Sequence, residues 1–345
     1  MSHWVPVTSG RLFSVVFALL LSACSESESF SIATQAIVDG TVSGIKDDAI
    51  VALATREGRC SAVLVAPNLV MTARHCIAIV NRTDNLRCKI DGTSSSDTPL
   101  ITGDYKPSEI WINLGPGSTW GTTPKVKRVV STESMTVCRN DLALVELEEP
   151  ISGYPILPIR LLKNTYAKEK MTVIGFGQTD AKSETQLRYR REGVDVLRVG
   201  PNRFDAQGGQ AVPGTFVVSQ GPCQGDSGGP AIAESTGAIA GIYSIMASDD
   251  CTSPSAIGVY VQVAEYYKLV LQTFDEIGVE PWLEGDPPPA YLEQNSNTSN
   301  EGCSLRSPSS HETMRFLPLG IVWFIYGLKR FRRRGSRRNK RKTPP

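Results

Sequence analysis

The chain has 345 residues, of which 41% are hydrophobic and 21% charged, so it is not an intrinsically disordered chain and can form a sizeable core. Its 36 Lys and Arg residues nearly balance its 35 Asp and Glu residues, for a net charge of +1. Residues 303–345 hold twelve of the basic residues and a single Glu. The rest of the chain is therefore net acidic, and we expect no nucleic-acid binding by its folded part.

The N-terminus has the pattern of an export signal. Arg11 is followed by an apolar run over residues 12–21, which is too short to span a bilayer, and then by Ser22, Ala23 and Cys24. We predict a signal peptide over residues 1–23 and a propeptide or tether over 24–36. Residues 21–24 also resemble the lipobox of bacterial lipoproteins, in which the cysteine is lipidated. A plain signal peptide cleaved after Ala23 is the alternative.

From residue 37 to about 274 the pattern is mostly that of β-strands. Short runs rich in Val, Ile, Leu, Tyr and Phe alternate with clusters of Gly, Pro, Asn, Asp and Ser; they include residues 50–54, 62–65, 142–147, 171–174, 215–218 and 238–243. Many short strands at close spacing predict an all-β barrel or sandwich. A helical pattern is convincing only over residues 263–274.

The C-terminal part of the chain changes character twice. Residues 276–302 contain three consecutive prolines and an Asn/Ser-rich stretch, which predicts a linker or stalk. Residues 303–345 contain Cys303, an apolar segment over 316–328 and ten basic residues over 329–342. This order resembles the sorting signals of some bacterial surface proteins, which a membrane peptidase removes. A membrane anchor with its basic tail on the cytoplasmic side is the alternative.

The strongest motif is GDSGGP at residues 225–230. A nucleophilic serine needs an exposed hydroxyl on a tight turn and backbone N–H groups aimed at the developing oxyanion. Glycines beside Ser227 permit that turn and let a substrate approach. A Gly-x-Ser-x-Gly segment also occurs in α/β-hydrolases, but the alternating strands and helices of that fold are absent from the pattern.

A general base and an orienting acid are also present. The chain has only three histidines, and His3 and His311 lie in the two terminal segments, which leaves His75 as the base available to Ser227. Asp141 opens the apolar run 142–147. A carboxylate buried there needs a partner, and an imidazole would provide one, although an Asp at a strand start can also face solvent.

Together, TARHC at 72–76, NDLAL at 140–144 and GDSGGP resemble the chymotrypsin-like (trypsin-type) serine protease family. The order His, Asp, Ser is the order of that family and not of the subtilisins or α/β-hydrolases. Further matches are IVDG at 37–40, IGFG at 174–177, GIYS at 241–244 and GVY at 258–260. The resemblance implies a protease domain over 37–275, made of two packed six-stranded antiparallel β-barrels and a C-terminal helix.

The resemblance assigns roles to particular residues. It implies a triad of His75, Asp141 and Ser227, with the N–H groups of Gly225 and Ser227 as oxyanion hole, and needs no metal or cofactor. It further implies that cleavage after Ala36 frees the α-amino group of Ile37 to pair with Asp226. Because Ala36 is neither Arg nor Lys, we expect the activating protease not to be trypsin-like, and it could be the chain itself.

The same resemblance locates the substrate pocket. It places Gly221 at the pocket floor, where no charge is available for Arg or Lys, and Met246 and Gly258 along the wall. Ser244 belongs to the GIYS segment, which resembles the strand that binds the substrate backbone. Met246 stands where glycine is usual and narrows the entrance. An uncharged, partly obstructed pocket predicts a small or medium apolar residue before the cleaved bond, although a flexible Met could swing away.

Six cysteines lie within the predicted domain, an even number that suggests three bridges in an exported protein. The family resemblance pairs Cys60 with Cys76 beside the catalytic histidine and Cys223 with Cys251 beside the pocket. Cys88 and Cys138 remain, and we expect them to pair with each other.

We therefore expect an exported serine endopeptidase of the bacterial cell envelope or surface, or released from it. Its partners would be a protein or peptide substrate, an activating protease, and signal and sorting peptidases, with membrane contact through the termini only. A non-catalytic protease-shaped binding module is the rival hypothesis from another class. An esterase that uses the same triad is a further alternative.

Overall fold

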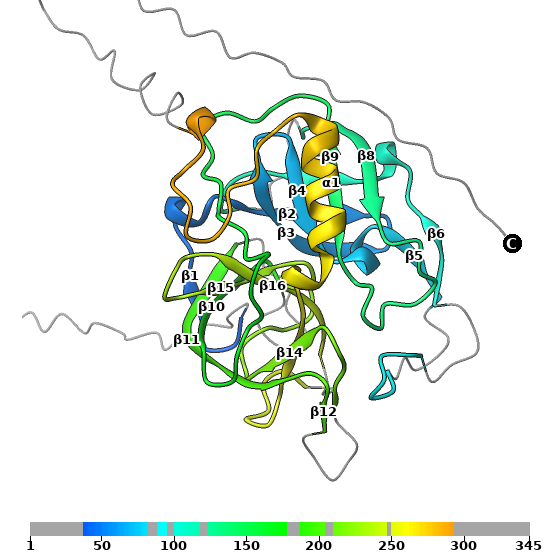
Figure 1. Ribbon diagram of the computed structural model, residues 1–345, viewed down its shortest axis with the longest axis vertical. Coiled ribbons are helices and arrows are strands. Elements are labelled where there is room, and N and C mark those ends of the chain that lie inside the picture. The colour runs from blue at the N-terminus through cyan, green and yellow to red at the C-terminus, as the bar shows by residue number, and fades with distance from the viewer. Residues whose placement is uncertain are drawn as a thin grey trace, which may run out of the picture. The chain divides into compact units, whose positions relative to one another are not determined.

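The computed structural model describes residues 37–81, 88–94, 100–117, 123–177, 187–203, 210–246 and 250–292 (Figure 1). Two large antiparallel sheets form most of this part, and one α-helix lies near its C-terminal end. The predictions for Cys24, for the segment before Ile37 and for residues 303–345 concern residues outside these ranges. Among the described helices, none is both long and apolar enough to cross a membrane.

The first large sheet has the strand order β7-β2-β3-β4-β9-β8. Its strands are β2 (Ile50–Thr55), β3 (Gly58–Ala66), β4 (Leu69–Thr72), β7 (Trp111–Asn113), β8 (Val126–Ser131) and β9 (Ala143–Leu147). Every residue of β4 and β9 is buried, so these strands appear in the sequence as mostly apolar runs, broken only by the buried Thr72 and Glu146. Strands β5 (Ala78–Val80) and β6 (Ile101–Asp104) pair with each other as a separate two-stranded sheet.

The second sheet has the order β11-β10-β15-β16-β17-β14 and closes on itself through a β11–β14 pairing. Its strands are β10 (Lys170–Gly175), β11 (Tyr189–Val199), β14 (Thr215–Val218), β15 (Pro230–Ala233), β16 (Ile239–Met246) and β17 (Gly258–Gln262). Strand β1 (Thr41–Val42) extends the edge of β11, and β12 (Asn202–Arg203) pairs with β13 (Gln210–Ala211).

The prediction of a mostly β chymotrypsin-like fold is confirmed, with one difference in the first barrel. Only the second sheet is a closed six-stranded barrel. In the described residues no pairing joins the end strands β7 and β8 of the first sheet, which is therefore a half-barrel.

The predicted helical segment forms a 3-10 turn, η4 (Val263–Tyr266), followed by α1 (Tyr267–Ile277). Three further 3-10 turns are η1 (Ile45–Asp47), η2 (Arg74–Cys76) and η3 (Pro107–Glu109). Val270 and Phe274 of α1 pack into the core of the first sheet, and Figure 1 shows α1 beside β9 and β4. Gly278 ends the helix in the left-handed conformation, with φ 68°.

The chain after α1 stays attached to the domain, unlike the linker predicted from residue 276. Residues Ile159 and Leu283 form a parallel β-bridge. The buried guanidinium of Arg160 donates to both oxygens of Glu169, at 2.8 and 2.9 Å, and of Glu284, at 2.8 and 3.0 Å. The linker prediction therefore does not describe residues 278–292. Besides the contacts of Arg160, the side chains of Leu283 and Leu292 pack against the core of the first sheet.

Candidate active site

His75 and Asp141 meet because two adjacent strands bring them together. His75 lies in η2, just after β4, and Asp141 lies just before β9. The antiparallel pairing of Thr72 with Ala143 places the end of β4 beside the start of β9. The Nδ1 atom of His75 then lies 2.8 Å from Oδ2 of Asp141, and the backbone N–H of His75 donates to Oδ1 at 2.9 Å.

The carboxylate of Asp141 is fully buried and does not face solvent. A third hydrogen bond comes from the second barrel, where the hydroxyl of Ser244 in β16 donates to Oδ2 at 2.5 Å. The charged form of a buried carboxylate is stable only when such donors replace water. The acid is therefore held in place, with one oxygen facing the His75 ring, which is 23% exposed.

Ser227 lies on a tight turn that is attached to the first sheet. The Ser61 N–H of β3 donates to the Ser227 carbonyl at 2.7 Å. Two positions require glycine: Gly225 has φ 94°, and a Cβ on Gly228 would lie 2.2 Å from the carbonyl oxygen of Ser61. The close approach of the turn to β3 sets where the Ser227 side chain points.

The backbone amides of this turn divide into two groups. The N–H groups of Asp226, Gly228 and Gly229 donate to backbone carbonyls at 2.8–3.1 Å. Within the described parts of the chain, the N–H groups of Gly225 and Ser227 have no hydrogen-bond acceptor. Two unpaired donors beside a serine hydroxyl are the arrangement that stabilises an oxyanion.

Asp226, the neighbour of Ser227, is enclosed and accepts hydrogen bonds from the backbone. The N–H groups of Cys223 and Gly177 donate to its carboxylate at 2.8 Å each, and the N–H of Ile37 is a third donor. Burial nevertheless raises the pKa of Asp226 to about 7. Ile37 is 1% exposed, and the next N–H, that of Val38, donates to the Gly221 carbonyl at 2.7 Å.

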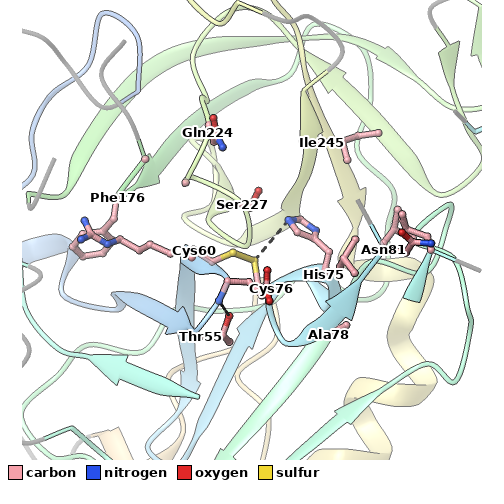
Figure 2. Close-up of a pocket in the computed structure, with 18 residues that line it drawn as sticks. Thr55, Cys60, His75, Cys76, Ala78, Asn81, Phe176, Gln224, Ser227 and Ile245 are labelled. Carbon is pink, nitrogen blue, oxygen red and sulfur yellow. Dashed lines mark hydrogen bonds between the residues drawn. A yellow bond between two sulfur atoms is a disulfide. The ribbon is translucent and has the colours of Figure 1, made fainter. Parts of the chain in front are cut away.

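A cavity of about 490 Å³ lies over these groups, and His75, Gly225 and Ser227 form part of its wall. Figure 2 shows the Ser227 side chain and the His75 imidazole extending into the same part of it. The wall is lined by apolar and by polar residues; the apolar ones include Ala78, Val80, Leu100, Val137 and Ile245, and the polar ones Thr55, Glu57, Arg59 and Gln224.

The four residues predicted to bind substrate are placed differently from one another. Ser244 is buried with its hydroxyl on Asp141, and Met246 packs against the core of the second barrel. Gly221 and Gly258 are buried, and neither they nor Met246 line the cavity. The structure thus brings the predicted pocket residues into packed contacts and not into the open cavity.

Two side chains that the sequence did not single out fill the space around Gly258. A Cβ on Gly258 would lie 2.5 Å from Pro222 and 3.2 Å from the ring of Tyr243. The Tyr243 ring is 2% exposed and lies 5.2 Å from the ring of Tyr260. The signal was available, since Tyr243 precedes Ser244 within the GIYS segment, but the sequence does not show which way its ring turns.

Three disulfides form among the cysteines that the structure describes. They join Cys60 to Cys76, Cys88 to Cys138 and Cys223 to Cys251. Cys60, His75 and Cys76 lie close enough together to resemble a metal site, but the two sulfurs are bonded to each other and leave no thiolate for a metal.

Relatives of this chain are proteases. Among curated proteins, a trypsin of Saccharopolyspora erythraea is 27% identical over 248 residues, which cover 68% of this chain and 97% of that protein. Serine protease sp-Eoc49 of Echis ocellatus is 30% identical over 148 residues, covering 39% of this chain and 54% of that protein. Human granzyme M is 28% identical over 217 residues, covering 60% of this chain and 76% of that protein.

The fold and the family model agree with these relatives. A solved structure of neuropsin, a serine protease of mouse brain, matches with a TM-score of 0.51 and 20% identity, over 69% of this chain and all of that one, which shows a shared fold. The family model described as Trypsin matches residues 37–270, well over half of the chain. The chain therefore belongs to the trypsin family of serine endopeptidases.

Proposed function

We propose that this chain hydrolyses peptide bonds through an acyl-enzyme formed on Ser227, with His75 as general base and Asp141 as the acid that orients it. The observation that carries the proposal is the 2.8 Å contact between His75 and the buried Asp141, together with the position of His75 in the wall of the same cavity as Ser227. The family supplies the reaction, and the geometry supplies a candidate residue for each role.

The proposed steps move one proton back and forth. The Ser227 hydroxyl attacks the substrate carbonyl and passes its proton to Nε2 of His75, while the carbonyl oxygen becomes an oxyanion facing the N–H groups of Gly225 and Ser227. His75 then gives the proton to the leaving amine, and the acyl-enzyme remains. A water molecule then attacks the acyl-enzyme by the same proton transfers through His75, and the carboxylic acid product leaves Ser227. Asp141 stabilises the imidazolium throughout and is not itself protonated.

We propose further that cleavage between Ala36 and Ile37 activates the chain. Ile37 is buried with its N–H on Asp226, where a free ammonium group would neutralise the carboxylate. Ile37 also has φ 53°, which is unfavourable for a β-branched residue. Cleavage removes the preceding carbonyl that defines this angle, so it relieves strain while it supplies the charge.

We propose a small residue at P1, the substrate position whose carbonyl is attacked. Pro222 and the Tyr243 ring pack against Gly258, where a larger P1 side chain would have to enter. By the family resemblance, the strand with Ser244 binds the substrate segment before the cleaved bond. That segment would then pass Ile245, the next residue of the same strand, which lines the cavity; Figure 2 shows Ala78 and Ile245 on the His75 side of Ser227 and Phe176 on the opposite side.

We propose that the protein is exported. The three disulfides of the described residues fit an exported protein, because such bonds form and persist in oxidising environments. Attachment to a bacterial envelope through a lipid at Cys24, and removal of residues 303–345 by a sorting peptidase, remain proposals that rest on the sequence.

Active-site labelling tests the mechanism. The full chain would carry an enteropeptidase recognition sequence in place of residues 32–36, so that one cut produces an Ile37 N-terminus. A fluorophosphonate is then added and the intact protein is weighed, with Ser227→Ala as the matched control. We expect a mass gain of one probe in the cleaved wild type, little gain before the cut and none in Ser227→Ala. Labelling of cleaved Ser227→Ala, or of neither protein, would refute the assignment.

A peptide library tests the specificity. The cleaved enzyme is given peptides that differ only at P1, and product masses locate the cut. Faster cleavage after Ala than after Phe or Arg supports the packed pocket. Faster cleavage after Arg or Phe would mean that Tyr243 and Pro222 leave the pocket when substrate binds.

A further inference from the structure

Residues 132–141 form a loop that connects β8 to Asp141, and its first part is fastened twice. The buried guanidinium of Arg74, next to His75, donates to the backbone carbonyl of Thr132 and, at 2.6 Å, to that of Ser134. The disulfide from Cys88 holds Cys138. These contacts fix where the loop runs, but none of them touches the end that carries Asp141.

The hydroxyl of Tyr266 bridges Arg139 and Asp141 at that end, where the Thr132 hydroxyl also donates to the Asn140 carbonyl at 3.4 Å. The Asp141 N–H donates to the hydroxyl oxygen of Tyr266 at 3.0 Å, and the same hydroxyl donates to the Arg139 carbonyl at 2.9 Å. Arg139 has φ 62°, the left-handed conformation, which turns the chain toward Asp141. Burial, and then the nearby Asp141 carboxylate, raise the pKa of Tyr266, so its hydroxyl keeps the proton that it donates.

Tyr266 itself is firmly held. It is 6% exposed and closes η4, immediately before α1, and it belongs to the core cluster that includes Val270 and Phe274. The C-terminal helix is thus packed on the first sheet, and the Tyr266 side chain just before it reaches the loop that carries Asp141.

We propose that Tyr266 is a positioning residue for catalysis, whose hydroxyl fixes the Asp141 backbone so that the carboxylate faces His75. Three hydrogen bonds to the Asp141 carboxylate set the orientation of its side chain. The Tyr266 hydroxyl instead accepts from the backbone N–H of Asp141, and so fixes the backbone that carries this side chain. This inference rests on the proposed triad and adds a residue 125 positions away from Asp141.

The test is Tyr266→Phe in the full chain with the engineered enteropeptidase site. Phenylalanine keeps the ring in the core and removes only the hydroxyl, which leaves the buried Asp141 N–H without an acceptor. We expect about a tenfold loss in kcat with KM nearly unchanged, since the defect lies in the transition state and not in substrate binding. The acid limb of the pH–rate profile should move to lower pH, because the imidazolium loses part of its partner charge.

A matched control is Tyr267→Phe, which removes the hydroxyl of the next residue, 43% exposed on α1. It should leave kcat and the pH profile unchanged. A second readout is the proton NMR signal of the bond between His75 Nδ1 and Asp141, which should weaken or shift in Tyr266→Phe only. This readout does not depend on turnover.

The outcomes separate the two proposals. If the cleaved wild type is inactive and is not labelled at Ser227, the proposed function is refuted. An active wild type with a Tyr266→Phe variant of equal kcat, pH profile and NMR signal would overturn the role of Tyr266. A variant with a lower melting temperature but an unchanged pH profile and NMR signal would also overturn it, since Tyr266 would then be merely structural.

Discussion

Asp226 should make the stability of the uncleaved chain depend on pH. Burial raises its pKa from 3.8 to about 7 in the folded chain. The folded state therefore binds this proton more tightly than the unfolded state does. The stabilisation that comes from this protonated Asp226 is complete below about pH 4 and is lost as the pH rises through about 7. Since each pKa unit corresponds to 1.36 kcal/mol, the loss amounts to about 4 kcal/mol.

The assay compares two uncleaved full chains that both carry Ser227→Ala, which prevents self-cleavage. One keeps Asp226 and the other has Asp226→Asn, which does not titrate. Urea unfolding at intervals from pH 4 to pH 8 gives the free energy of unfolding of each. The other titrating groups cancel in the difference. We expect the chain with Asp226 to lose about 4 kcal/mol more than the Asn chain between these limits.

Cleavage at Ala36 should change the result, because a free ammonium on Ile37 pairs with the charged carboxylate. In the cleaved Ser227→Ala protein, the extra loss between pH 5 and pH 8 should disappear. If the free energy of unfolding changes equally with pH in the two uncleaved chains, the raised pKa of Asp226 is refuted. An undiminished loss after cleavage would refute the pairing with Ile37.

Three substitutions test other parts of the structure. Arg160→Met leaves two buried carboxylates facing each other and should lower the free energy of unfolding in urea by about 3–5 kcal/mol. The control Lys163→Met, at a side chain that is 55% exposed, should change it by less than about 0.5 kcal/mol; equal losses in the two variants would show that the ion pairs of Arg160 do not stabilise the fold. Ser244→Ala removes a donor from Asp141 and should lower kcat about tenfold in steady-state assays, and an unchanged kcat would mean that its hydroxyl serves another purpose. Tyr243→Val should raise the kcat/KM ratio of Leu over Ala at P1 about tenfold; a constant ratio would show that the ring does not limit the pocket.

Much of this protein could be predicted from local patterns. The turn around Ser227 needs glycines within two or three residues, so its motif is contiguous in the chain. The buried strands appear as apolar runs, and residues 50–54, 142–147 and 171–174 lie almost wholly in β2, β9 and β10. The order of His75, Asp141 and Ser227 then indicated the family, which the family model confirmed.

The tertiary structure decided what those residues contact. Ser244 was expected on the substrate and donates to Asp141, while Tyr243 fills the space beside Gly258. The first barrel is open, and residues 278–292 are bound in part through Arg160. Periodicity shows that a residue is buried but not which residues it packs against, because partners such as Ser244 and Asp141 lie 103 positions apart in the chain. The hydroxyl of Tyr266 behind Asp141 is such a contact, since nothing in the neighbouring sequence of either residue refers to the other.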